Sequence, residues 1–599
     1  MSTTTAASAP VPAVTRADPL HELDARGAAE HAHVEALLRC WLRETGTPVA
    51  PGPLRVELPA CGLALVTEVT HCSPTGWHRF APTRLEGPAG PLGAVADPVT
   101  AVALLSTEAA VRGGGRPGGV PAGEVADLVE RTAESVRRVA AFIADRRSRP
   151  QPPAGVDGFL DAEQALLLGH LNHPAPKSRD GISERDAAAF SPELRGSFRL
   201  HWFAADPSVV SHDAVEGAPS LAGRDTVALL ADLAGHRPGD GRVLVPAHPW
   251  QARDLLHRPR IEALVASGAL EPLGELGPTW WPTSSVRTVY RPDADVMLKL
   301  SLGLRLTNSR RESTRTELRR GLEINRLLDA GYADSTFRSH PGFAVTRDPA
   351  WLAVDEPGRP EGPDVTGLDV AVREVPRGIA GLRCLVGLVA PRPGLGRSAL
   401  GELVAALGPG AAERWTADYT DKVLVPMLHL YAATGIGLEA HQQNTLVRLD
   451  AHGRVTGGTF RDNQGYYLAA SYLPGLLKRL GADSSTLAVV DDALVDDRLS
   501  YYLLRNQALS VVGCLAVDGL ADERRLLAVL AERLRAALPA LAAAGPDGDR
   551  LARRWLEADT LPCKGNLLTR LHGIDEVLAP LDAQSVYLDA PNPLREAAP

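Results

Sequence analysis

Helical spacing of hydrophobic residues marks four stretches of this chain, at residues 22–44, 123–146, 314–329 and 412–434. In the first two, apolar residues return every three or four positions with charged residues between them, which predicts amphipathic helices. We expect another helical segment at 162–168, and the apolar residues of 500–515 predict a helix hairpin.

Strands are indicated where apolar residues alternate with polar ones or form short runs. Residues 54–70 predict two antiparallel strands around a turn at 59–62, and the run 243–247 predicts a buried strand. Further strands are predicted at 282–290, 296–302 and 368–374. The chain therefore combines predicted helices with predicted strands.

Proline and glycine divide the chain. With 599 residues, it exceeds a single hydrophobic core, and breaks at 151–155 and 391–396 provide two boundaries. We therefore expect domains at 21–152, 153–392 and 393–599. Residues 1–20 are rich in small residues and proline, which favours a disordered lead-in.

Composition excludes some classes of protein. The net charge of −9 leaves no basic excess for a nucleic-acid partner. The six cysteines form no Cys-x-x-Cys pair and no zinc-type cluster, so free thiols in a reducing cytosol are the simplest account. Apolar runs fall short of the roughly 20 residues that cross a bilayer. We expect a soluble, cytoplasmic protein without membrane association.

The densest group of polar side chains lies at residues 439–465. After an opening cluster the segment passes through apolar residues, turns near 452–453 and returns to Asp462; the cluster contains Glu439, His441, Gln443 and Asn444. A hairpin would bring both polar ends together. Amide and carboxylate oxygens that face each other suit Mg²⁺ held against a phosphate. The alternative is a polar hairpin at a solvated sheet edge.

Lys299 lies inside a predicted strand, where a lysine is unfavourable unless an anion meets it. The preceding strand carries hydroxyl groups and a guanidinium, from Ser284, Ser285, Arg287 and Thr288. Such a pair of strands is typical of a nucleotide-binding hairpin, in which the lysine meets a phosphate. Arg305 and Thr307 follow two residues apart, so we expect them to share one face and to bind one carboxylate or phosphate.

Other motifs allow a functional and a structural interpretation. The loop GHLNHPAPKSRDG at 169–181 combines cationic donors with rigid prolines, which favours an anion site over a plain surface loop. KGNLLTRL at 564–571 fits a carboxylate site or a solvated helix start equally well. In PAHPWQ at 246–251, His248 is more typical of a residue that caps a turn. GGGRPGG at 113–119 lacks the lysine and hydroxyl of a phosphate loop and favours a flexible loop.

Together these motifs resemble a known family. GHLNHPAPKSRDG, PAHPWQ, SSVRT (284–288), KLSLGLRLTNSRR (299–311), EAHQQN (439–444), FRDNQG (460–465) and KGNLLTRL occur in the order found in the siderophore synthetases that work without a peptide-synthetase assembly line. These are the aerobactin-synthetase, or IucA/IucC-like, enzymes. The resemblance covers about residues 160–575.

The resemblance implies an α+β fold with a cupped-hand architecture, in which residues 21–152 form a thumb, residues 153–392 the fingers and residues 393–599 a kinase-like palm. It also implies a ligase that uses ATP and Mg²⁺. Such a ligase adenylates a carboxyl group of citrate or a related polycarboxylate. An amine, hydroxylamine or alcohol then attacks to give an amide or ester. Homodimers are common in such families.

Site residues follow from the same resemblance. The implied ATP contacts are Ser284, Ser285, Arg287, Thr288, Lys299, Glu439 and Gln443. The implied metal ligands are Asn444 and Asp462. The implied carboxylate-binding residues are His170, Lys177, Arg305, Thr307, His441, Arg505 and Lys564. Arg305, His441 and Lys299 are the implied catalytic residues, which stabilise charge on the reacting carboxyl group and the phosphates.

Two other functions remain open at this point. A kinase-like phosphotransferase acting on a small hydroxyl substrate would use the same hairpin, but it needs an aspartate shortly before Asn444, and residues 439–443 contain none. A non-enzymatic ligand-binding protein would not need both a triphosphate site and metal ligands. The sequence leaves open which acid is used, among citrate, a citryl or succinyl half-product and 2-oxoglutarate. The nucleophile is equally open.

Overall fold

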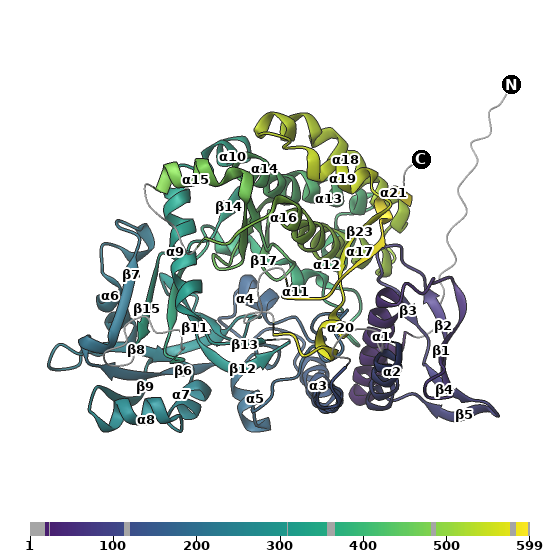
Figure 1. Ribbon diagram of the computed structural model, residues 1–599, viewed down its shortest axis with the longest axis horizontal. Coiled ribbons are helices and arrows are strands. Elements are labelled where there is room, and N and C mark those ends of the chain that lie inside the picture. The colour runs from purple at the N-terminus through teal and green to yellow at the C-terminus, as the bar shows by residue number, and fades with distance from the viewer. Residues whose placement is uncertain are drawn as a thin grey trace.

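The computed structural model describes residues 18–22, 24–112, 120–307, 309–355, 366–480, 487–575 and 583–596. The expected disordered start up to residue 17, the glycine loop 113–119 and residues 356–365 lie outside the described residues. Three regions follow one another along the chain: helices with a small sheet, a large antiparallel sheet, and a mostly helical region with short sheets (Figure 1).

In the first region, three helices pack together beside a five-stranded sheet. The helices are α1 (Ala25–Glu44), α2 (Pro98–Arg112) and α3 (Ala122–Ser148), and the strands are β1 (Gly52–Leu58), β2 (Leu63–His71), β3 (Arg79–Phe80), β4 (Arg84–Gly87) and β5 (Gly90–Val95). The predicted helices and the antiparallel strand pair are confirmed. The Asp24 side chain caps α1 by accepting from the backbone N–H groups of Arg26 and Gly27.

The second region contains an eight-stranded antiparallel sheet in the order β7-β15-β16-β11-β10-β9-β6-β8. Its strands are β6 (Phe198–Ala205), β7 (Val210–Ala214), β8 (Val243–Ala247), β9 (Leu270–Pro282), β10 (Thr288–Tyr290), β11 (Val296–Leu300), β15 (Ala350–Val354) and β16 (Val370–Glu374). The hairpin of β12 (Leu302–Leu306) and β13 (Ser309–Arg311) follows β11. The helices here are α4 (Gly158–Glu163), α5 (Glu184–Phe190), α6 (Thr226–Ala234), α7 (Pro249–Leu255), α8 (Pro259–Ala266), α9 (Arg315–Asp329) and α10 (Asp334–Ser339).

Two predictions for this region are wrong. The expected strand at 282–290 is two strands joined by a turn, because the Thr283 N–H donates to the Thr288 carbonyl at 2.8 Å and Val286 adopts a φ of +67°. The helical segment expected at 162–168 ends at Glu163 instead. Capping by the His248 side chain, which accepts from the Trp250 N–H, is confirmed.

In the third region, helices surround two small sheets and a terminal strand pair. The strands are β14 (Phe343–Val345), β17 (Leu382–Cys384), β18 (Ile436–Leu438), β19 (Thr445–Leu449), β20 (Val455–Phe460), β21 (Tyr466–Ala469), β22 (Val489–Val490), β23 (Thr560–Lys564) and β24 (Tyr587–Pro591). The helices are α11 (Leu385–Val389), α12 (Ala399–Ala406), α13 (Ala411–Tyr419), α14 (Val425–Thr434), α15 (Leu473–Leu480), α16 (Asp492–Leu499), α17 (Leu509–Val517), α18 (Glu523–Ala544), α19 (Arg550–Glu557), α20 (Asn566–Leu571) and α21 (Pro593–Glu596). The predicted hairpin at 439–465 is confirmed as the β19–β20 pair.

The expected helix hairpin at 500–515 is wrong. Residues 500–508 form a π-helical segment that continues α16 directly into α17. The chain has no glycine or proline between residues 499 and 512 that would end the helix and turn it back.

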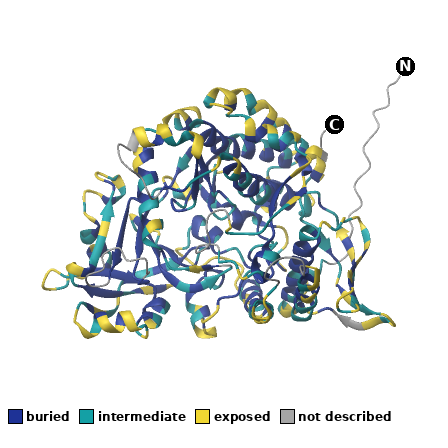
Figure 2. Ribbon diagram, viewed as in Figure 1, coloured by how far each residue is buried: buried dark blue, intermediate teal, exposed yellow. Residues whose placement is uncertain are grey.

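The buried residues form one core around the large sheet and another in the third region (Figure 2). A smaller cluster joins them: Phe159 and Leu160 of α4 pack with Met297 of β11 and Leu446 of β19. This joint holds β11 beside the β19–β20 hairpin. In the described part of the chain, no helix is both long and apolar enough to cross a membrane.

Candidate active site

A cavity of about 320 Å³ lies where the large sheet meets the third region. Its walls come from the turn at 283–287, from β11, from the tip of the β12–β13 hairpin and from segments of the third region. Fourteen of the predicted site residues line it, and Arg305 and Arg505 do not; the fourteen are His170, Lys177, Ser284, Ser285, Arg287, Thr288, Lys299, Thr307, Glu439, His441, Gln443, Asn444, Asp462 and Lys564.

At one end of this central cavity, Lys299 contacts Asp462. The lysine Nζ donates to Asp462 Oδ1 at 2.7 Å and to Gln464 Oε1 at 2.6 Å. Asp462 sits at a φ of +93°, an unusual conformation that turns the chain directly after β20. The anion expected to meet the buried lysine is therefore, in this structure, the chain's own carboxylate.

The charge state of Asp462 follows from its neighbours. Burial raises the pKa of its carboxyl group, but the Lys299 ammonium and the Arg373 guanidinium outweigh burial and hold that pKa well below its usual range. Arg373 Nη2 lies 3.8 Å from Asp462 Oδ1 and is itself fixed by Asp348 at 2.6 and 2.8 Å. Asp462 is thus an anion at any physiological pH.

The turn at 283–287 is held by a buried ion pair that sequence reasoning missed. Glu163, fully buried at the end of α4, accepts from Ser284 N at 3.0 Å and Ser284 Oγ at 2.7 Å. Its other oxygen lies 2.6 Å from Arg461 Nη1. Arg461 precedes Asp462, so this contact ties the turn to the Asp462 segment. The FRDNQG motif contains Arg461, but no sequence signal pointed to Glu163.

Arg287 projects from the same turn toward the β12–β13 hairpin. Its Nη1 donates to the Arg311 carbonyl at 2.9 Å and to Ser313 Oγ at 3.1 Å. Within the described residues, neither Arg287 nor Arg311 forms an ion pair with a carboxylate. The cavity therefore holds two guanidinium groups whose charge no protein carboxylate neutralises directly, which suits an anionic ligand.

Asn444, just before β19, also lines the central cavity and contacts two residues of its own segment. Its Nδ2 donates to the Glu439 carbonyl at 3.2 Å and contacts His441 Nε2 at 3.3 Å. Because an amide N–H only donates, His441 Nε2 acts as the acceptor and the ring hydrogen lies on Nδ1. Burial lowers the pKa of His441 to about 4, so the imidazole is neutral at pH 7.

Glu439 is an acidic side chain in a mostly cationic cavity. Its Oε1 accepts from the Tyr467 hydroxyl at 2.5 Å, and burial raises the pKa of its carboxyl group. Asp462 adds to that increase through its negative charge. The surroundings thus shift the pKa values of these two acids in opposite directions, that of Glu439 upward and that of Asp462 downward.

His170, Asn506 and Lys564 also line the central cavity. His170 Nε2 contacts Asn506 Nδ2 at 3.1 Å, and burial lowers the pKa of His170 to about 3. Lys564 is buried at the end of strand β23, so it is not part of a solvated helix start. The motifs 169–181 and 564–571, which lie far apart in the chain, therefore meet in one cavity.

Two predicted carboxylate ligands are engaged elsewhere. Lys177 lines the cavity, but its ammonium contacts the buried Glu193, which also binds Arg179. The Arg505 guanidinium donates to the backbone carbonyls of Leu561, Ala590 and Pro591. Arg505 therefore supports the β23–β24 pair, and the structure does not bring it to the cavity.

The expectation that Arg305 and Thr307 share one face is wrong. Thr307 has left the strand, with a φ of +57°, and lines the central cavity. Arg305 lies on the other face of the hairpin and lines a separate cavity. Arg311 reaches the central cavity instead, where its Nη2 donates to Thr307 Oγ1 at 3.2 Å. Strand alternation in the sequence could have separated Arg310 from Arg311.

The chain matches models of known protein families. Residues 158–390 match the model of the IucA / IucC family, and residues 413–578 match the model described as ferric iron reductase FhuF-like transporter. The class of protein is thus defined: the chain belongs to the IucA/IucC family of siderophore synthetases.

Two curated relatives cover almost the whole chain. The rhizobactin siderophore biosynthesis protein RhbC of Rhizobium meliloti (strain 1021) is 36% identical over 94% of this chain and 98% of the relative. The spermidine-citrate ligase of Bacillus anthracis is 33% identical over 96% of this chain and 99% of the relative. The solved structure of ATP-bound aerobactin synthetase IucA from a hypervirulent Klebsiella pneumoniae has a TM-score of 0.80 at 27% identity, over 94% and 99% of the two chains.

Proposed function

We propose that this protein adenylates a carboxyl group of citrate or a related polycarboxylate with ATP and Mg²⁺, and then joins the acyl group to an amine, hydroxylamine or alcohol. The observation that carries the proposal is a single cavity lined by several cationic side chains together with the ionised Asp462. We place the triphosphate at Arg287 and Lys299, the nucleotide end, and the polycarboxylate near His170 and Lys564, the carboxylate end. A triphosphate and a polycarboxylate bound together need several cations within one cavity.

The nucleotide end fits the phosphates of ATP. Arg287 and Lys299 would bind phosphate oxygens, and the hydroxyls of Ser284, Ser285 and Thr288 would contact neighbouring oxygens or the sugar. Lys299 would exchange part of its contact with Asp462 for the phosphate. Glu439 and Gln443 lie at the edge of the same space and complete the proposed ATP contacts.

The donors present fit Mg²⁺. Asp462 supplies an ionised carboxylate, and the Asn444 amide nitrogen is occupied by Glu439 and His441, which leaves its oxygen on the opposite side. Mg²⁺ commonly uses one or two protein oxygens together with phosphates and water. When bound there, the ion would neutralise phosphate charge as pyrophosphate leaves. No group of three or more acidic, histidine or cysteine ligands is found among the described residues.

The carboxylate end would be formed by Thr307, Arg311, His441, His170 and Lys564. We place Arg311 in the role that sequence reasoning gave to Arg305, because Arg311, unlike Arg305, lines the cavity that contains Lys299 and His441. The neutral His441 donates from Nδ1 and the Arg311 guanidinium from its N–H groups. Both would stabilise the acyl group as charge moves onto its oxygen.

The chemistry balances without a covalent enzyme intermediate. A carboxylate oxygen attacks the α-phosphorus, the bond to the β-phosphate oxygen breaks, and pyrophosphate leaves. The amine or hydroxyl then attacks the acyl carbon, the bond to the adenylate oxygen breaks, and AMP leaves with one proton released. Positioning and charge neutralisation supply most of the catalysis. The relatives named as a spermidine-citrate ligase and an L-2,3-diaminopropanoate–citrate ligase support citrate and an amine.

We also propose that the thumb, fingers and palm correspond to residues 21–152, 153–392 and 393–599. The two family matches, at 158–390 and 413–578, each fall within one of these ranges. The joint formed by Phe159, Met297 and Leu446 would then lie between fingers and palm. Limited proteolysis that releases fragments with ends near 152 and 392 would support these boundaries.

The test is pyrophosphate release with ATP, Mg²⁺ and hydroxylamine, measured separately with citrate, succinate, 2-oxoglutarate and no acid. Release and AMP formation with one acid would establish adenylation and identify the acid. Formation of ADP and a phosphorylated product would instead establish the phosphotransferase alternative. Nucleotide binding without product from any of these acids or from a citryl half-product would favour a binding protein.

A further inference from the structure

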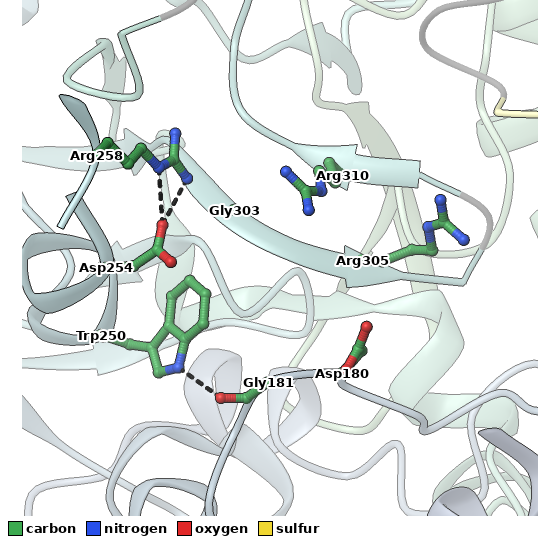
Figure 3. Close-up of a pocket in the computed structure, with 8 residues that line it drawn as sticks. All are labelled: Asp180, Gly181, Trp250, Asp254, Arg258, Gly303, Arg305 and Arg310. Carbon is green, nitrogen blue, oxygen red and sulfur yellow. Dashed lines mark hydrogen bonds and ion pairs between the residues drawn. The ribbon is translucent and has the colours of Figure 1, made fainter. Parts of the chain in front are cut away.

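A second cavity, of about 350 Å³, lies on the other face of the β12–β13 hairpin (Figure 3). We call it the outer cavity; it is lined by Asp180, Gly181, Trp250, Asp254, Arg258, Gly303, Arg305 and Arg310. The proposed reaction uses none of these residues. Trp250 of PAHPWQ and Asp180 and Gly181 at the end of the 169–181 loop form part of the wall, and none of these three residues lines the central cavity.

Strand geometry places two arginines side by side in this cavity. Arg305 and Arg310 are partners across the antiparallel hairpin. Directly paired residues project from the same face of a hairpin, and two like charges there repel each other. Within the described part of the chain, neither guanidinium has a hydrogen bond or an ion pair with the protein. A ligand carrying negative charge would relieve that repulsion.

Arg258, the third arginine that lines the outer cavity, is already neutralised by carboxylates of the chain. Arg258 binds Asp254 at 2.6 Å and Glu312 at 2.6 Å, and Gln251 donates to Glu312 at 2.8 Å. Gln251 also accepts from the Gly303 N–H at 2.6 Å. A Cβ at Gly303 would lie 2.7 Å from a guanidinium nitrogen of Arg258, so a larger residue there would require the arginine side chain to shift.

An aromatic wall completes the cavity. The Trp250 indole N–H donates to the Gly181 carbonyl at 3.0 Å, which fixes the ring against the loop (Figure 3). Asp180 stands beside Gly181 and has no ion pair among the described residues. It faces the two arginines across the cavity (Figure 3). Its carboxylate would repel an anion and therefore tune the affinity.

We propose that the outer cavity is a second anion site, which binds a small molecule with at least two negative charges through Arg305 and Arg310. Paired guanidiniums recognise carboxylate and phosphate oxygens alike, so the ligand class is a polycarboxylate or a polyphosphate. The site does not depend on the proposed reaction, because nothing in it requires turnover. It shares with the central cavity only the hairpin and the loop that ends at Gly181.

The experiment is calorimetric titration of the full chain with citrate, with pyrophosphate and with acetate, each alone. We expect a binding event in the outer cavity with citrate or pyrophosphate in addition to any event in the central cavity, and none with acetate. Binding of citrate but not of pyrophosphate would identify a polycarboxylate site, and binding of pyrophosphate but not of citrate would identify a polyphosphate site. If neither citrate nor pyrophosphate shows a binding event in addition to the one in the central cavity, the proposal is wrong.

Substitutions test whether the second binding event takes place in the outer cavity. Arg310→Ala should weaken it at least about tenfold, since it removes a charged hydrogen-bond donor. Asp180→Asn should strengthen it, a gain that misfolding would not produce. Arg253→Ala is the matched control, because Arg253 is an exposed arginine on the same helix as Trp250, paired with Asp186 and outside the cavity. Equal affinities in the Arg310→Ala and Arg253→Ala proteins would overturn the assignment.

Discussion

One hairpin separates two arginine-containing cavities, and the two differ in how their charges are held. In the central cavity, Lys299, Arg373 and Arg461 are buried and each contacts a carboxylate of the chain. In the outer cavity, Arg310 is exposed and without a carboxylate partner in the described residues. Burial makes charge placement in the central cavity strict, whereas solvent can screen the charges of the outer one.

Arginines that lie close together in the sequence line different cavities. The run from Arg305 to Arg311 contains three arginines, and a residue list alone makes each a candidate for the reacting carboxyl group. The pleat of the hairpin sends Arg305 and Arg310 to one face and Arg311 to the other. A function for each arginine therefore follows from the face on which it lies.

The largest expected effect separates two consecutive residues. Arg311→Ala should lower pyrophosphate release by roughly 100-fold or more, because it removes a donor from the reacting carboxyl group. Arg310→Ala, with the same change of charge on the opposite face, should keep release within about threefold of the unchanged protein. Steady-state kinetics with the acid found to be a substrate measures both.

Arg305→Ala sharpens this result. A loss as large as that of Arg311→Ala would return the catalytic role to Arg305 and would merge the two cavities into one functional site. A mild effect would keep them separate. Thermal melts of all three variants would show whether any loss of activity comes from unfolding.

The next effect compares a buried ion pair with a half-exposed one. Glu163→Gln leaves Arg461 buried without its charged partner and should lower the free energy of unfolding by about 3 kcal/mol. Asp254→Asn acts on Arg258, whose side chain is 28% exposed and keeps Glu312, so we expect a loss of less than about 1 kcal/mol. Urea unfolding measures both, and equal losses would contradict the contrast in burial.

Lowering the pH should reduce the stability of the folded chain through buried histidines of the central cavity and not through the arginines of the outer cavity. Burial lowers the pKa values of His170 to about 3 and of His441 to about 4, below the ordinary value of 6.5. The unfolded chain then binds protons that the folded chain excludes, so stability is complete above pH 6.5 and falls as the pH drops toward 4. Each histidine should contribute up to about 2 kcal/mol between pH 6.5 and 5.

Unfolding measured at pH 7 and pH 5 tests this expectation. His170→Gln should reduce the loss of stability on acidification, whereas Arg310→Ala should leave the slope unchanged because an arginine does not titrate in this range. The buried His33 and His248, whose pKa values burial lowers to about 4 and about 3, add to the total slope in every variant. An unchanged slope in His170→Gln would contradict the role of its burial.

The smallest effect concerns salt. Raising the ionic strength from about 0.05 to 0.5 M should weaken anion binding in the outer cavity several-fold, because its arginines face solvent. Binding at the buried Lys299 end should change less. Calorimetry with pyrophosphate at both ionic strengths compares the two, and a uniform effect of salt would show that the two cavities are equally exposed.

Local patterns in the sequence determined much of this protein. The helical spacing of α1 and α3, the β1–β2 pair, the β19–β20 hairpin and the cap at His248 depend on neighbouring residues and were predictable. The motif order indicated the family, and fourteen of the sixteen predicted site residues line one cavity. The secondary structure depends on neighbouring residues, and the site residues are recognisable because few other residue types bind phosphates, carboxylates or Mg²⁺.

Tertiary structure alone decided the remaining features. Lys177 forms an ion pair with Glu193, and Arg505 donates to backbone carbonyls. Glu163 forms an ion pair with Arg461, which lies 298 positions later in the sequence. Each outcome depends on which segments pack together, and a charged side chain binds whatever partner that packing places beside it. The fate of a buried charge is therefore a property of the whole fold, because its stability depends on partners that the local sequence does not contain.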